Sequence, residues 1–226
     1  SKTINDISLG FLSPQSLKYG SLDSLVIGLS SLQNMKRLAF HASYGDEMKT
    51  FFNGLRFKID LQSISLTLPY AKVVEVEALA QFLSYQRYLQ ELSIEYERRG
   101  HAQAKLTPLF QAISKLLLLK RLRLVFEDLS YEVYKGLLNM LESLIYLEEV
   151  SLKEFEGFIV REKSLLLKSL VDHAYLKSLD FNATFKSDPD FIDFLLLLKK
   201  FKKLDYLRIH PMRIVITEKI MSPDKL

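Results

Sequence analysis

The sequence predicts an α/β fold, a solenoid in which about eight short parallel strands alternate with helices. Two periodic patterns indicate this class. An apolar-x-x-apolar-x-apolar triplet recurs eight times between residues 4 and 209, with 26 to 31 residues between successive first positions. Between the triplets, apolar residues recur at the i, i+3, i+4, i+7 spacing of an amphipathic helix. One strand and one helix cannot bury both their faces alone, so the copies have to stack.

The triplets are the predicted strands. Their first residues are Ile4, Met35, Leu61, Leu89, Leu119, Leu147, Leu176 and Leu204. Stacked strands lie about 4.8 Å apart, whereas neighbouring helix axes need about 8–10 Å. The stack is therefore expected to curve, with parallel strands on the concave face and helices on the convex face.

The predicted helices lie between the triplets and are about ten to fourteen residues long. Their clearest apolar stripes are Leu22, Leu25, Val26 and Leu29; Met48, Phe51, Phe52 and Leu55; Val76, Leu79, Ala80 and Leu83; and Phe191, Phe194, Leu195 and Leu198. The pairs Thr107-Pro108 and Asp188-Pro189 are typical of an N-cap followed by proline at the first helical position. Ser21, Asp46 and Ser130 are further predicted N-caps.

The two ends of the chain differ from the middle. We expect one domain over residues 1–221, followed by a frayed tail at 222–226. The apolar residues Met212, Ile214, Ile216 and Ile220 predict a closing strand. Because the chain starts with Ser and has only three residues before Ile4, we expect a fragment of a larger protein. A further domain or subunit is then expected against the first repeat, whose apolar surface would otherwise be exposed.

The triplets and the helices that follow them resemble a leucine-rich repeat protein. The repeat length, near 28 to 30 residues, and the helical outer face are most similar to the ribonuclease-inhibitor-like subgroup. This resemblance implies a horseshoe and a role in binding other proteins. The chain also departs from the family, which usually has Asn or Cys eight residues after the first triplet position. Here those positions hold Leu12, Ser43, Pro69, Glu97, Glu127, Phe155, Thr184 and Met212.

Motifs for catalysis are absent from the sequence. There is no cysteine, and therefore no disulfide, thiolate nucleophile or thiolate metal site. The four histidines form no HExxH, and no GxGxxG, GxxxxGK or GxSxG is present. We therefore expect no enzyme activity, no cofactor and no metal.

Three absences favour a cytoplasmic, intracellular protein without a membrane partner. Cysteine is missing, the first twenty residues do not have the pattern of a signal peptide, and no apolar run reaches the ~18–20 residues of a membrane-spanning helix.

The predicted binding surface is the concave face of the sheet. Residues between and just after the triplet positions point to it, and they are polar and of mixed charge. Seven strand spacings make the face roughly 34 Å long, enough for a standard protein interface of about 800 Å² per partner. The predicted partner-binding residues are Arg37, His41, Glu91, Glu95, Arg121, Arg123, Lys153, Asp180, Tyr206, Arg208 and His210. Among them Arg121, Arg123, Tyr206 and Arg208 are the strongest candidates, because Tyr and Arg are enriched at interface hot spots.

The function expected from these patterns is a non-catalytic scaffold for protein–protein interaction. The alternative is a nucleic-acid-associated protein that uses the basic C-terminal repeat. Its cations would be Lys199, Lys200, Lys202, Lys203, Arg208, Arg213 and Lys219. Residues 127–156 hold eight acids against two Lys and would repel a long polyanion, so nucleic acid is the less favoured partner.

Overall fold

The structure is a computed structural model. It describes residues 4–11, 21–42, 48–68, 73–96, 106–126, 131–153, 160–182, 188–210 and 213–214.

Strands and helices alternate along the chain. The elements are β1 (Asp6–Phe11), α1 (Ser21–Ser31), β2 (Arg37–Ala42), α2 (Met48–Leu55), β3 (Ser63–Thr67), α3 (Val73–Ser84), β4 (Glu91–Tyr96), α4 (Thr107–Ile113), β5 (Arg121–Phe126), α5 (Tyr131–Ser143), β6 (Glu149–Lys153), α6 (Val160–Leu170), β7 (Ser178–Asn182), α7 (Asp188–Leu198), β8 (Tyr206–His210) and β9 (Arg213–Ile214). The predicted strand–helix repeat is thus confirmed.

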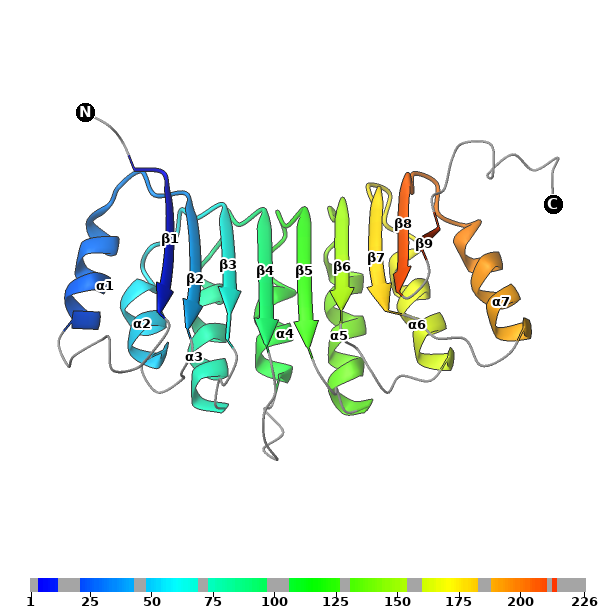
Figure 1. Cartoon of the computed structure of the whole chain (residues 1–226), viewed down its shortest axis with the longest axis horizontal. Coiled ribbons are helices and arrows are strands. Elements are labelled where there is room, and N and C mark those ends of the chain that lie inside the picture. The colour runs from blue at the N-terminus through cyan, green and yellow to red at the C-terminus, as the bar shows by residue number, and fades with distance from the viewer. Residues whose placement is uncertain are drawn as a thin grey trace.

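All described strands belong to one sheet, in which spatial order equals chain order (Figure 1). Neighbours from β1 to β8 are parallel, and β9 pairs antiparallel with β8. The predicted closing strand is therefore confirmed over Arg213–Ile214. The rest of its predicted span, and the tail at 222–226, lie outside the described residues.

The strands pair without stagger. Arg121 at the start of β5 pairs with Glu91 at the start of β4 and with Glu149 at the start of β6. Consequently the middle and the last triplet positions each form a continuous row across the sheet. The middle positions form the row Ile7, Leu38, Ile64, Leu92, Leu122, Val150, Leu179 and Leu207.

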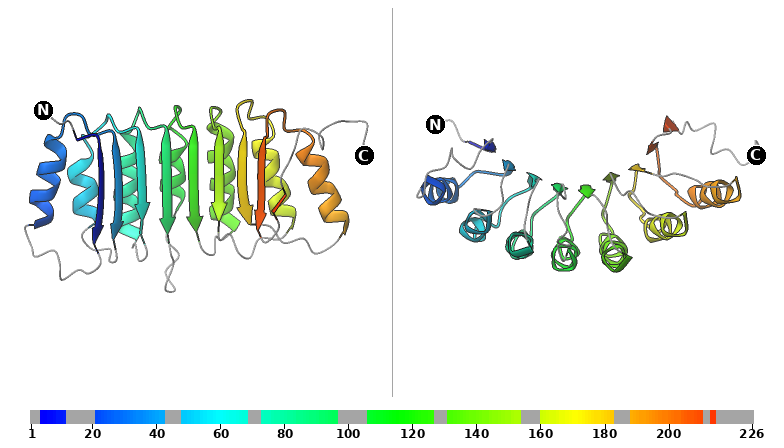
Figure 2. Two further views of the ribbon diagram at one scale, coloured as in Figure 1. Left: turned by 45° about the horizontal axis from the view of Figure 1, so that its top comes forward. Right: turned by 60° about the horizontal axis from the view of Figure 1, so that its bottom comes forward.

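The sheet curves into an arc. Viewed nearly along the strands, the strands lie on the concave side and the helices on the convex side (Figure 2). The core fills the space between these two layers, where triplet residues meet the helix stripes and ring pairs such as Phe52–Phe82, at 5.6 Å between centroids, join neighbouring helices. The fold is a solenoid-like α/β repeat.

A backbone hydrogen-bond pattern repeats where each strand begins. The carbonyl of Lys120 accepts bonds from the N–H groups of Glu148 and Glu149, at 2.8 and 3.0 Å. The carbonyls of Asn5, Lys36, Gln62, Gln90, Glu148 and Lys177 accept the same pair of bonds from the following repeat. These bonds tie neighbouring turns together. The eight positions at which the family usually has Asn or Cys lie outside the described residues.

The predicted start of α4 is wrong by one residue. The N-cap is Leu106, which makes no side-chain cap bond, and Thr107 is the first helical residue. The N–H of Phe110 donates to the carbonyl of Leu106, and burial of the Leu106 side chain in the core fixes this start. Two helices are also shorter than predicted, because α2 has 8 residues and α4 has 7. The predicted caps Asp46 and Ser130 lie outside the described residues.

The buried face of α7 differs from the predicted apolar stripe. Leu195 is exposed, whereas Leu197 is buried together with Phe194 and Leu198. In the Leu195–Leu198 run any face of the helix is apolar, so packing against α6 selects the buried face. Ile4, the first predicted triplet residue, is also exposed rather than buried, since it lies just before the edge strand β1.

Candidate partner-binding surface

The concave face is formed by the side chains that alternate with the buried triplet rows. In β4 the alternation is complete, with Leu92 and Ile94 buried and Glu91, Ser93 and Glu95 partly exposed. Val125 is an exception that the alternation does not predict. It is only 4% exposed, because the long side chains of Glu95 and Lys153 flank it on the neighbouring strands.

A shallow groove of about 480 Å³ runs across the middle and C-terminal half of this face. Strands β3 to β8 line it. Of the predicted partner-binding residues, the groove brings together Glu91, Arg121, Arg123, Lys153, Asp180, Tyr206 and Arg208. It also includes residues that the prediction did not select, namely Glu149 and the serines Ser63, Ser65, Ser93, Ser151 and Ser178. The alternation places these on the face, but it does not show which strands the groove spans.

Opposite charges pair across the strands of the groove. The Arg121 guanidinium contacts the Glu91 carboxylate on the preceding strand, and the Ser63 hydroxyl donates to Glu91 at 3.2 Å. The hydrogen bond to Glu91 raises the pKa of Arg121 above its usual value, and the charges of Glu91 and Glu149 act in the same direction. Arg121 therefore stays ionised at neutral pH.

Two further pairs run diagonally between rows. Arg123 lies 3.9 Å from Glu95, and Lys153 lies 3.3 Å from Asp180. The Ser151 hydroxyl is 3.5 Å from the same Asp180 carboxylate. The partly exposed Arg123–Glu95 pair contributes only about 0–1 kcal/mol, so a bound partner can exchange it for its own charges at little cost in stability. The Lys153–Asp180 pair is more buried and is therefore a more fixed part of the groove.

Two charges of the groove have no opposite charge in contact within the described part of the chain. Arg208 instead lies over the ring of its neighbour Tyr206, with its Cζ 5.5 Å from the ring centroid. Glu149 stands exposed at the start of β6. The Tyr206–Arg208 pair is therefore a preformed aromatic and cationic surface at one end of the groove.

Arg37, His41 and Glu95 are not among the residues that line the groove. Arg37 and His41 are exposed on β2, where Arg37 lies 3.7 Å from Asp6. Glu95 contacts the groove through Arg123. His210 ends β8, and its side chain lies outside the described residues.

The cations of the nucleic-acid alternative do not share one surface. Lys199, Lys200, Lys202 and Lys203 are exposed in the turn between α7 and β8, whereas Arg208 lies in the concave groove. The Arg213 side chain and Lys219 lie outside the described residues.

Comparison of the sequence with protein-family models and with curated proteins gives no match. Within the described ranges, no helix has the length and apolar character needed to cross a membrane. In the same ranges, no group of three or more His, Cys, Asp or Glu is positioned to hold a metal ion.

Proposed function

We propose that this chain is a divergent leucine-rich repeat protein that acts as a non-catalytic scaffold and binds a protein partner on its concave face. The observation that supports this most directly is the continuity of the polar rows. Eight in-register strands hold them at fixed spacing over a buried core, and a groove crosses six of these strands. A rigid backbone loses little freedom on binding, which favours affinity.

The charge arrangement indicates the kind of partner. Three cross-strand pairs neutralise most of the groove, so its net field is weak and long-range steering is small. Recognition then depends on shape and on the β8 end of the groove, where Tyr206 and Arg208 provide the residue types of an interface hot spot. A polypeptide segment with an acidic group for Arg208 fits this surface.

The test is a comparison of charge-reversed variants. A partner is first captured from the native source with the wild-type chain and identified by mass spectrometry. Arg123→Glu with Arg208→Glu should then weaken its binding by about tenfold or more. The matched control, Lys49→Glu with Lys168→Glu, makes the same charge change on exposed helix positions and should bind normally. Equal binding by both double variants, at equal thermal stability, would reject the concave face as the binding site.

A further inference from the structure

Five of the seven turns that join a helix to the next strand are closed by the same backbone hydrogen bond. The N–H of Leu119 donates to the carbonyl of Leu116 at 2.9 Å, and the N–H of Leu147 donates to that of Leu144 at 3.1 Å. The same bond closes the turns that end at Met35, Leu89 and Leu176. Each is a four-residue β-turn, and its two central residues form an outward-facing tip.

Four consecutive turns carry apolar or aromatic residues at their tips, and the first of these tips also contains Arg87. We call these residues the tip ridge: Tyr88, Leu117, Leu118, Ile145, Tyr146 and Tyr175. Their exposed fractions lie between 45% and 60%, and the rings of Tyr146 and Tyr175 are 5.8 Å apart. They lie on neighbouring turns of consecutive repeats, so their exposed apolar groups are gathered along one edge rather than scattered over the surface.

The fold does not require apolar tips. Turns of this kind favour Gly, Pro, Asn, Asp and Ser at their centre. The turn that ends at Met35 is closed by the same hydrogen bond, yet its exposed tip is Gln33-Asn34. The tip ridge therefore needs an explanation outside folding.

The turns form a level edge. Because the first residues of neighbouring strands pair without stagger, the turns before them end at the same height along the strand direction (Figure 1). The turns follow the arc of the solenoid (Figure 2). A flat surface can therefore contact all of them at once, whereas a straight rod such as a helix meets only part of the arc.

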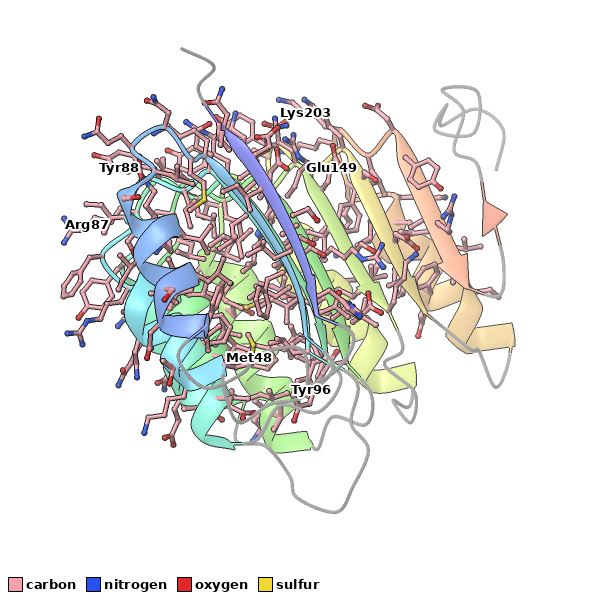
Figure 3. The ribbon with its side chains drawn as sticks, turned by 60° about the vertical axis from the view of Figure 1, so that its left-hand side comes forward. Met48, Arg87, Tyr88, Tyr96, Glu149 and Lys203 are labelled. Carbon is pink, nitrogen blue, oxygen red and sulfur yellow. The ribbon has the colours of Figure 1, made fainter. Side chains whose placement is uncertain are left out.

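This edge is also strongly basic. The seven turns between a helix and the next strand contain eleven Lys and Arg and four acids, a net charge of +7. The whole chain carries +4, so the rest of the chain carries −3. Arg87 lies at one end of the ridge, and four lysines lie at the other, where Lys203 is 5.2 Å from the ring of Tyr175. Figure 3 shows Arg87, Tyr88 and Lys203 toward the upper end of the molecule, away from Met48 and Tyr96.

We propose that this turn edge binds the surface of an anionic lipid bilayer. The tip ridge inserts at the headgroup level, where tyrosine is favoured because its ring is apolar and its hydroxyl stays hydrated. The flanking lysines and arginines face the anionic headgroups, which attract such clusters. This departs from the sequence-based expectation of no membrane partner, which rested on the lack of a spanning helix. A contact in the plane of the interface needs no such helix.

Vesicle co-sedimentation tests the apolar part. Wild-type chain should bind vesicles of phosphatidylcholine with phosphatidylserine, and bind phosphatidylcholine alone much less. The tip variant carries Leu117→Gln, Leu118→Asn, Ile145→Gln and Tyr146→Asn, which copies the Gln33-Asn34 tip. Its binding should fall by about tenfold or more, with an unchanged melting temperature, because the replaced side chains are exposed.

The charge part is tested separately. Lys202→Glu with Lys203→Glu should weaken binding to the phosphatidylserine vesicles, whereas the helix-face control Lys49→Glu with Lys168→Glu should not. The concave variant Arg123→Glu with Arg208→Glu should bind vesicles like wild type. Failure of this proposal and failure of the concave-face proposal are therefore distinguishable.

Four outcomes would overturn the proposal. One is no binding of wild type to the anionic vesicles at low salt, and another is equal binding by the wild type and the tip variant. The third is equal binding to both kinds of vesicle. The fourth is that a short oligonucleotide or an acidic protein binds this edge while vesicles do not, which would assign the edge to that partner instead.

Discussion

Gly54 of α2 lies directly against Val26 of α1, so that a Cβ at position 54 would overlap Cγ1 of Val26 and approach its Cβ to 3.2 Å. The two helices are neighbours in the convex layer, and Val26 is buried between them. The absence of a side chain at position 54 therefore sets how closely the first two helices pack.

Gly54→Ala should destabilise the protein by about 1–3 kcal/mol, because the stiff valine has to move within a packed layer. The control is Gly28→Ala in α1, where an added Cβ meets no atom within 4 Å. That change should stabilise the protein by about 0.5–1 kcal/mol through helix propensity. Denaturant unfolding followed by circular dichroism measures both, and an equal effect of the two variants would contradict this account.

Asp60→Asn should cost about 1–2 kcal/mol of stability, between the values for exposed and buried ion pairs. Asp60 lies 3.0 Å from the Nζ of Lys58, which is only 8% exposed, and 2.9 Å from that of Lys36. Although its partial burial raises the pKa of Asp60, the hydrogen bonds and charges of the two lysines outweigh this and lower it. Without the carboxylate, the buried ammonium loses its counter-charge. Asp6→Asn, at an exposed pair with Arg37, should change stability by less than about 0.5 kcal/mol.

Acidification from pH 7.5 to 5.5 should destabilise the protein through His173. Burial lowers the pKa of His173, despite the bond of 2.9 Å that its Nε2–H donates to the carbonyl of Leu141. The unfolded chain therefore binds more protons than the folded chain below about pH 6.5. As a result, the free energy of unfolding decreases as the pH decreases. His173→Leu introduces the residue that Leu116 and Leu144 provide in equivalent turns, and it should reduce this loss. His41→Gln leaves His173 in place and should retain it, as melting temperatures across pH would show.

Leu122→Ala should cost about 2–5 kcal/mol, since the side chain is buried in the middle of the row between Leu92 and Val150. Leu117→Ala, at a tip that is 60% exposed, is the control and should change stability by no more than about 0.5 kcal/mol. Similar losses of stability at the two positions would contradict the role of the buried triplet rows as the core of the fold. Thermal unfolding by circular dichroism is a sufficient measurement.

The repeat could be predicted from sequence because burial leaves a periodic trace. Rows such as Leu92, Leu122 and Val150 need an apolar residue in every copy, and a shift of one residue would turn them to solvent. The same alternation places the polar rows on the concave face of the sheet. Features that depend on tertiary packing have no periodic pattern in the sequence. In α7, for example, Leu197 is buried and Leu195 is exposed, which the apolar spacing did not predict.

The candidate site was predicted only in outline. Alternation places Arg123 and Glu95 on one face, but their pairing depends on side-chain length and rotamer, which the pattern does not contain. The burial of Val125 has the same origin, because long neighbours cover it. The tip residues were missed for another reason. A leucine beside buried leucines, as in the run from Leu116 to Leu119, looks like core until the turn geometry is known.

The doubled hydrogen bond at the start of each strand has a consequence for how such a chain can change in length. Because the carbonyl of Gln90 holds the next repeat in the same way as that of Lys120 does, these backbone bonds do not depend on which two copies are neighbours. Excision of one complete unit, for example residues 91–120, would let Gln90 take the place of Lys120 beside Glu149 and leave a shorter arc with all its remaining ladders intact. The backbone ladder of this architecture is thus modular, so a change in the number of units needs adjustment only where two helices become new neighbours.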